Sequence, residues 1–329
     1  MAFEPHPWFI GLEGVEHSAE VARMLAWSAT GGASGIITSG DLKVSAQSVP
    51  SDSVRIAPGG FVVESKYAGA SQQSYVERVP TSTTLEVPAT GSSGGATRYV
   101  VARVTDPDYP GGGTVPSVPN DGVYAAPYLV SSLSSSRTEI VLAKITQPAN
   151  TAAITNAMIT DLRVVANPRT WVVDRSDPLE LVDTETLTST TTGERFPNGG
   201  GMQLIDIPED ATRCIVEAEW LQINEPGGEA YGKCWVEWGP LKSGSTTERE
   251  YSTQKFMWNT PGSSGSSRNM WKVSQEMWVP AEVRGTEQIF SMRGILDYAS
   301  SNAARPQMDR WSGITFKVTF QEMADWSSS

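Results

Sequence analysis

Histidine is almost absent from this chain of 329 residues, which contains only His6 and His17. A Ser-His-Asp or Cys-His catalytic site needs a histidine beside its nucleophile, and both histidines precede the first predicted helix. The metalloprotease motif HExxH, paired CxxC motifs and a P-loop are missing as well. We therefore predict no catalytic residues of these classes, no metal site and no cofactor.

Long apolar runs and an excess of positive charge are also lacking. No segment approaches the ~20 apolar residues of a membrane helix, and the first residues lack the basic start of a secretory signal. The net charge is −12: residues 1–163 carry 10 basic and 14 acidic groups, and the remainder carries 15 and 23. Both halves would repel a phosphate backbone. We expect neither membrane insertion nor nucleic-acid binding.

Cysteine is scarce too, with only Cys214 and Cys234 in the chain. Both lie in strand-like runs. If 212–223 and 232–240 form a hairpin, the turn at Pro226-Gly227-Gly228 puts the two cysteines out of register. We predict reduced core residues, as in a protein that assembles in a reducing cytosol.

What the chain has in quantity is glycine, with 30 residues, and proline, with 21, a composition typical of short strands and many turns. We predict a mainly β protein. Residues 1–163 should form a β-rich module with one short helix, 164–178 a connector, and 179–329 a jelly-roll-like β-sandwich. Eight of the 11 tryptophans fall between 220 and 326, and eight candidate strands follow the connector, a number that suits two packed sheets.

The predicted helix runs from Ala19 to about Ala29. Ser18 is a good N-cap and Gly31-Gly32 a good end. Val21, Met24 and Leu25 fall on one helical face, which we expect to lie against a sheet.

Five short motifs follow one another in the first half of the chain. They are Ala19-Glu20 with Arg23; Asp41 to Val44; Ile56-Ala57-Pro58-Gly59 with Phe61; Arg98 with Val101 to Val104 and Asp106; and Leu142 to Ile145 followed by Thr160 to Arg163. In this order they resemble the N-terminal module of minor tail (baseplate-type) proteins of phages that infect high-GC Gram-positive bacteria. The family often has an acidic residue two positions after the arginine of the fourth motif, where this chain has Val100.

The resemblance covers about half of the chain. It implies a virion component of the phage tail that is assembled in the host cytoplasm and contacts other tail subunits. It also implies a homotrimer, because phage adhesins of this kind commonly assemble around a threefold tail axis.

For the second half we predict a receptor-binding domain that binds host cell-wall polysaccharide. Trp235 and Trp278 fall on polar strand faces, where an aromatic ring can stack on a sugar or seal a subunit contact. Asp297 and Tyr298 begin a loop that we expect to form a rim. Burial of the tryptophans under loops is the competing interpretation.

Two other functions remain open at this stage. A glycan-cleaving tail enzyme needs two carboxylates held apart in a cleft, and Glu217, Glu219, Glu237 and Asp297 are the candidates. A purely structural tail spacer is the other alternative. We predict binding without catalysis.

The run 212–223 carries apolar residues on both faces. Cys214, Val216, Ala218 and Trp220 occupy one face, and Ile215, Leu221 and Ile223 the other. Because a sandwich strand needs only one apolar face, we predict that Ile215, Leu221 and Ile223 form the contact between subunits of the trimer. Burial of this second stripe beneath a loop is the alternative.

Overall fold

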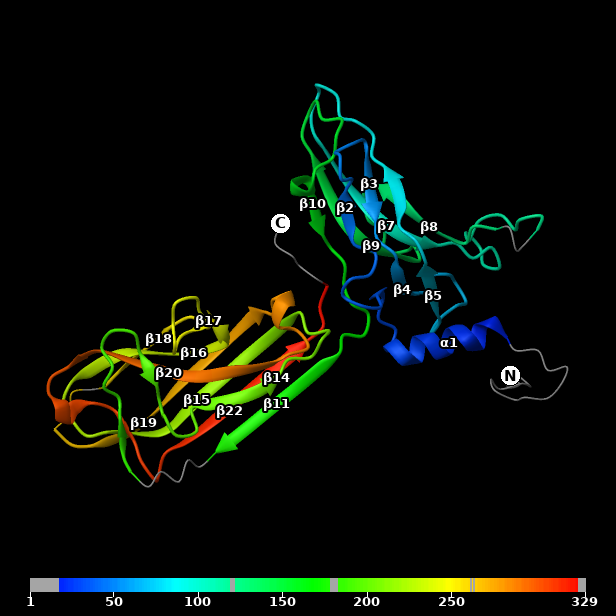
Figure 1. Ribbon diagram of the computed structural model, residues 1–329. Helices are drawn as coiled ribbons and strands as arrows, with labels where there is room; N and C mark the ends of the chain where they lie inside the picture. The colour runs from blue at the N-terminus through cyan, green and yellow to red at the C-terminus, as the bar shows by residue number, and fades with distance from the viewer. Residues whose placement is uncertain (1–17, 119–121, 178–182, 261, 263, 325–329) are drawn as a thin grey trace. The chain divides into compact units, whose positions relative to one another are not determined.

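The structure, a computed structural model, describes residues 18–118, 122–177, 183–260, 262 and 264–324 (Figure 1). Its contacts divide the chain into two compact units. Unit 1 comprises Met1–Pro168 with Met323–Ser329, and unit 2 comprises Arg169–Glu322. Both are mainly β, as predicted, and α1, Ala19–Thr30, is the single α-helix within the described ranges.

The expected connector over 164–178 is not a separate segment. Ile36 pairs with Val165, which is 4% exposed in the core of unit 1. From Thr170 to Asp177 the chain forms β11, which pairs along its whole length with the last strand of unit 2. Trp171 and Val173 in this strand pack against the core. The sequence predicts a short strand at 171–173 within the connector; in the structure this strand belongs to unit 2, so the boundary lies between Pro168 and Arg169.

Unit 1 consists of three small antiparallel sheets. The first sheet has the order β1 (Gly35–Ile36), β4 (Gly59–Glu64), β5 (Ser74–Val79); the second β2 (Val44–Ala46), β3 (Ser53–Ile56), β6 (Thr83–Glu86); the third β10 (Ile159–Asp161), β9 (Glu139–Gln147), β7 (Ala96–Val104), β8 (Ala125–Val130). A 3-10 turn, η2 (Asn156–Met158), precedes β10. Their shared core is aliphatic, with Phe61 as its fully buried aromatic residue among those described.

Helix α1 begins where the sequence predicts, because the Ser18 hydroxyl accepts a hydrogen bond from the backbone N–H of Glu20. The face that packs is a different one, however. Met24 and Leu25 are 47% and 49% exposed, whereas Arg23 and Trp27 reach the sheet through side-chain hydrogen bonds to Gln73 and Glu64. The side chains of Arg23 and Trp27, one turn apart, therefore hold the helix by polar contacts, and Met24 and Leu25 of its predicted apolar face are exposed.

Unit 2 has two antiparallel sheets. The first has the order β11, β22 (Gly313–Gln321), β15 (Arg213–Glu225), β19 (Ser267–Trp278). The second has the order β14 (Met202–Asp206), β20 (Glu287–Ala299), β16 (Ala230–Leu241), and then β17 (Arg249–Ser252) and β18 (Phe256–Asn259) in one line. Short elements complete the unit: β12 (Glu185–Thr186), β13 (Glu194–Arg195), η3 (Ala281–Val283), η4 (Asn302–Ala304) and β21 (Gln307–Met308).

This strand order is that of a jelly roll. With β17 and β18 taken as one interrupted strand, the first sheet contains the first, eighth, third and sixth strands in chain order, and the second contains the second, seventh, fourth and fifth. Two interlocked Greek keys produce this arrangement. Figure 1 shows β11 and β22, the first and last of these strands, side by side. The predicted jelly-roll-like sandwich is thus present.

The core of the jelly roll is aromatic. Trp220 and Trp238 are fully buried, and Trp258 stacks on Trp271 with ring centroids 4.5 Å apart. Burying four indoles removes a large apolar area from water and favours this fold strongly.

Cys214 and Cys234 are both free and buried, as predicted. The hairpin considered for 212–223 and 232–240 is absent, because β15 and β16 belong to different sheets. Burial raises the pKa of each thiol to about 12, so both are inert as nucleophiles near neutral pH.

Candidate functional site

The chain passes between the two units twice, at Pro168–Arg169 and at Glu322–Met323. Both of these crossings lie at the same end of the jelly roll. Thr170, where β11 begins, pairs with Gln321, where β22 ends, and Gln321 also pairs with Arg213 at the start of β15. The chain reaches the opposite end at Glu225 and enters the second sheet there at Ala230. Residues around Ala230 therefore lie at the end of the jelly roll opposite to both crossings.

Two tyrosines form an exposed aromatic surface at this distant end. Tyr231 on β16 and Tyr298 on β20 are ladder partners, 38% and 42% exposed. Their rings stack with centroids 5.3 Å apart and planes 23° from parallel. Flat aromatic faces with one side open to water are the usual platform for a sugar ring. The structure therefore places Tyr298, one of the predicted glycan-binding residues, in a suitable setting.

A cavity of about 480 Å³ adjoins this pair. Its lining residues are Glu229, Ala230, Tyr231, Met257, Trp258, Asn259 and Thr260. Met257 is 73% exposed. An open hollow with a carboxylate, an amide and apolar surface offers the mixed contacts that polyols require.

Asp297, another predicted residue, lies next to the tyrosine pair. Its carboxylate forms a 2.7 Å ion pair with Lys233, which lies two residues after Tyr231 on β16. The pair places fixed hydrogen-bonding groups of both charges beside the aromatic surface.

Trp235 cannot stack on a ligand, because it is 0% exposed. A side chain at Gly193 would collide with its ring, and the Lys255 ammonium lies 4.3 Å from the ring centroid. Its indole N–H donates to the Glu237 carboxylate at 2.8 Å. The competing interpretation, burial under a loop, describes this residue, and the glycan-contact prediction for it was wrong.

Trp278 is half-buried and lies apart from the tyrosines. It ends β19 in the other sheet, opposite Arg213, at the end of the jelly roll where the chain crosses to unit 1. The Arg284 guanidinium lies 5.8 Å from its ring centroid. The four predicted glycan residues therefore do not form one site: Asp297 and Tyr298 come together, and Trp235 and Trp278 do not join them.

The four carboxylates considered for hydrolysis are all ion-paired. Their partners are Lys317 for Glu217, Lys272 for Glu219, Arg293 for Glu237 and Lys233 for Asp297. A glycosidase needs one carboxylic acid free to protonate the leaving group, whereas each of these carboxylates is held in an ion pair.

Trp311 is an exposed aromatic residue that the sequence analysis overlooked. It is 67% exposed and lies in the loop before β22, at the end distant from the crossings. Asp309 fixes this loop through its carboxylate. It accepts a hydrogen bond from the Trp311 backbone N–H, and two more from the terminal Nη1 and Nη2 of Arg268, at 2.9 and 2.6 Å. An aspartate two residues before a tryptophan in a polar loop was the available signal.

Two of the three residues of the predicted subunit contact lie on the outer face of β15. Ile215 and Leu221 point away from the core and are half-buried. Ile223 is fully buried, because the chain bulges between Trp220 and Ile223, with Gln222 at φ +55°. The bulge inserts one residue and turns the next side chain to the other face, so assigning Ile223 to the outer stripe was wrong.

In unit 1 the motifs that carry the family resemblance meet in space. Arg163, with a fully buried side chain, forms an ion pair with Asp161 and donates to the backbone carbonyls of Ser39 and Asp41. Gly59 passes so close to Asp41 that no side chain fits there. The second, third and fifth motifs are thereby held together.

The first and fourth motifs meet in the same way. Arg23 of α1 pairs with Asp106, at 3.6 Å, and its guanidinium lies over the rings of Tyr75 and Tyr109. Tyr75 donates to the Asp106 carboxylate at 2.7 Å. Burial and this neighbouring negative charge raise the pKa of Tyr75.

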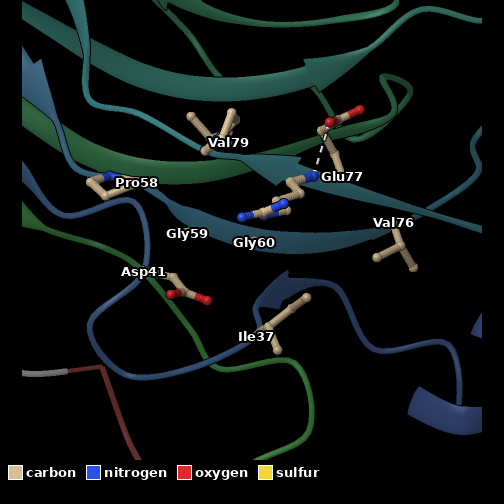
Figure 2. A pocket seen from close by; sticks show the side chains of 10 residues that line it. Ile37, Asp41, Pro58, Gly59, Gly60, Val76, Glu77 and Val79 are labelled. Atoms are coloured by element: carbon tan, nitrogen blue, oxygen red, sulfur yellow. Dashed lines mark hydrogen bonds between the residues drawn. The ribbon is translucent and has the colours of Figure 1, made fainter.

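A second cavity, of about 600 Å³, opens in unit 1 over the β4–β5 hairpin. Figure 2 shows Ile37 and Asp41 across the Gly59–Gly60 segment from Glu77 and Val79. Ile37 and Val76 are 47% and 58% exposed. Apolar side chains beside an edge strand suit a contact with another protein chain.

Within the described part of the chain, no helix has the length and apolar character that a membrane crossing requires. Nor do three or more histidine, cysteine, aspartate or glutamate side chains converge there to hold a metal ion.

No protein family and no curated protein matches the chain. Among solved structures it is similar to the Gx strain of infectious bursal disease virus, at 11% identity over 90% of this chain and 72% of that one, with a TM-score of 0.25. A VP2 subviral particle of that virus matches at 11% identity with the same coverage and a TM-score of 0.22. A Bacillus thuringiensis Cry1Da tryptic core variant matches at 9% identity over 95% of this chain and 56% of that one, with a TM-score of 0.14. With TM-scores this low, none of them supports an assignment of fold or function.

Proposed function

We propose that this protein is a minor tail, baseplate-type component of a phage virion, with unit 1 as the tail-attachment module and unit 2 as a receptor-binding domain for host cell-surface glycan. The order of the five motifs supports the first part. Their convergence on Arg163 and Arg23 adds to it, because residues that match the family pattern hold one another in place.

The observation that carries the second part is the stacked, exposed pair Tyr231 and Tyr298. It lies beside a cavity, next to a fixed ion pair, at the end of the jelly roll away from both chain crossings. A receptor-binding domain anchored at one end needs its ligand surface at the other.

Binding without cleavage is the function that the carboxylates favour. Each of the four candidates has a cationic partner, which suits a fixed polar contact better than proton donation to a leaving group. Zymography with wall polysaccharide separates the two functions, and a clearing zone that withstands purification of the protein would establish the enzyme instead.

The binding test uses the full chain and purified wall polysaccharides from a panel of high-GC Gram-positive bacteria. The wild type should bind at least one of them. Replacing both tyrosines, Tyr231→Ala with Tyr298→Ala, should weaken that binding about tenfold to a hundredfold, at ~0.5–1.5 kcal/mol for each stacking ring that is lost.

Tyr128→Ala is the matched control, since Tyr128 is 38% exposed in unit 1. It should leave binding unchanged. Equal binding by the double variant and the control would exclude the tyrosine pair as the site. A wild type that binds no polysaccharide of the panel but does bind other tail subunits would favour the structural spacer.

A further inference from the structure

Two arginines lie directly opposite each other on the outer face of the second sheet. Arg195 on β13 is the ladder partner of Arg293 on β20, and Arg293 is in turn the partner of Trp235 on β16. Like charges at directly opposed positions destabilise a sheet. Such an arrangement calls for something that offsets the repulsion.

A third arginine joins them. Arg249 on β17 donates its backbone N–H to the Glu237 carboxylate and its guanidinium to the carbonyl of Gly239, both at 3.4 Å. The pKa of Arg249 is lowered, by burial first and then by the positive charges of Arg195 and Arg293, with Glu237 acting in the opposite direction. The Arg249 backbone N–H and the Arg293 Nε both approach the same oxygen of Glu237, and Arg195 is the ladder partner of Arg293, so the three arginines form one cluster.

One carboxylate offsets these three charges. Within the described residues, Glu237 is the carboxylate that forms an ion pair with any of the three arginines, to Arg293 at 3.4 Å. Its other oxygen is occupied by the Trp235 indole N–H. The neighbouring Glu194 is turned away and accepts from Thr188 and Ser189. The cluster keeps an excess of two positive charges in a protein whose net charge is −12.

One of its donors, the Nε–H group of Arg195, is buried and has no hydrogen-bond acceptor, and the Nε–H group of Arg293 faces only the Glu237 carboxylate, 3.4 Å away and outside hydrogen-bond geometry. The Arg293 side chain is only 6% exposed. A buried guanidinium donor without an acceptor is costly, and nearly all such groups in proteins have a partner. Arg195 and Arg249 are half-buried and Lys255 is exposed, so the cluster is open to solvent on one side.

The geometry points to an oxyanion-binding site formed by Arg195, Arg249 and Arg293, with Glu237 as the internal carboxylate that positions them. Its ligand is a single phosphate or carboxylate group, because the guanidinium fork matches both. The acidic protein around the site disfavours a long polyanion.

The site shares its sheet face with the tyrosine pair. Tyr231 and Trp235 are four residues apart on β16, roughly 13 Å along the strand. One saccharide chain of a few units spans that length, so we assign the oxyanion to an acidic substituent of the glycan that the tyrosines contact. This last step rests on the proposed function; the site itself does not.

The test of the site uses the full chain with two free probes, inorganic phosphate and glucuronate, titrated calorimetrically at constant ionic strength kept with chloride. We expect one saturable site per chain for at least one probe. Arg195→Gln and Arg249→Gln should each weaken binding about tenfold or more, since each removes charge-assisted hydrogen bonds. Arg175→Gln, at an exposed arginine of β11, is the control and should bind as the wild type does.

Glu237→Gln should change the affinity for the probes in the opposite direction to the arginine variants. Removing the internal carboxylate should tighten binding of the probe, and the probe should raise the melting temperature of this variant more than that of the wild type. Phosphate binding alone indicates a phosphate-bearing ligand, and glucuronate binding indicates an acidic sugar. Absence of saturable binding of either probe, or equal binding by Arg195→Gln and Arg175→Gln, would overturn the site.

A separate measurement tests whether the oxyanion site binds an acidic substituent of the glycan. Arg195→Gln should weaken binding of an acidic wall polysaccharide while Tyr231 and Tyr298 are intact. If the free probes bind and the polysaccharide binds Arg195→Gln unchanged, the oxyanion site stands and its assignment to the glycan falls. Loss of polysaccharide binding in the tyrosine variant, with probe binding retained, tests the proposed function separately.

Discussion

The two units reach stability by different means. Unit 2 has strands of up to 13 residues and a core with four buried indoles. Unit 1 has strands of two to nine residues and an aliphatic core, and its distant segments are joined by arginines, with Arg163 bound to two backbone carbonyls and Arg23 to a tyrosine cluster. Long strands specify their neighbours by alternation of side chains. Short ones need specific polar contacts to fix their place.

The two units should therefore tolerate substitutions at different positions. In unit 2 the outer face is free to carry the tyrosines and the arginine cluster, because the indoles between the sheets supply the stability. In unit 1 the polar groups themselves hold the fold, so substitutions at charged positions should be costly there.

The largest effect on stability is expected when a buried indole is removed from unit 2. Trp220→Ala should cost about 3–5 kcal/mol, because Trp220 is fully buried and its indole N–H donates to the carbonyl of Phe196. Urea unfolding followed by circular dichroism and fluorescence should show a selective loss in one of two transitions. Trp311→Ala, at an exposed position, should cost less than about 0.5 kcal/mol; equal costs would refute an indole-based core.

The corresponding change in unit 1 is Arg163→Met. It should cost about 3 kcal/mol, because it leaves Asp161 and the carbonyls of Ser39 and Asp41 without their partner. The same unfolding experiment should show the loss in the other transition. Arg55→Met is the control: Arg55 is exposed and binds the hydroxyl of Ser82. A cost no greater than that of the control would mean that the aliphatic core alone holds unit 1.

Alkaline pH should weaken unit 2 through its thiols. The pKa of Cys214 and of Cys234 is about 12 in the folded protein against 9.0 without burial. A raised folded pKa means that the stability is fully present below pH 9 and is lost as the pH rises from there to 12. At pH 10 the loss should be about 1.4 kcal/mol per thiol. The double variant Cys214→Ala with Cys234→Ala should lose this part of the pH dependence, and an unchanged slope between pH 8 and 10 would contradict it.

The same contrast explains what the sequence predicts and what it does not. Alternation in long strands predicts the jelly roll and the burial of Trp220, since a period of two is visible residue by residue. The bulge at Gln222, which moves Ile223 to the core, leaves no such trace. Trp235 misleads for a related reason: its strand face is polar, but the segment around Gly193 covers it.

The candidate sites were predicted only in part, again for physical reasons. Asp297 and Tyr298 are neighbours in sequence, so their proximity was certain, whereas Tyr231 joins them through a ladder between strands far apart in the chain. The arginine cluster draws on three strands separated by up to about a hundred residues. Pairing at that distance depends on the strand order, which composition and spacing do not specify.

The smallest effect on stability is expected at the proposed subunit contact. Leu221→Asp should change the stability of a single chain by less than about 1 kcal/mol, since Leu221 is half-buried on the outer face. If the protein is the homotrimer we propose, an uncompensated charge in the contact should shift the mass measured by light scattering towards one chain. A wild-type mass of one chain at micromolar concentration would rule out the trimer.

We propose that attachment to the tail and glycan binding belong to separate units of the chain. The most direct measurement compares polysaccharide binding by the full chain with that of the fragment 169–322, once circular dichroism shows the fragment to be folded. We predict equal affinity per chain, and no binding by the complementary fragment 1–168. A folded 169–322 fragment that fails to bind the polysaccharide that the full chain binds would contradict the claim.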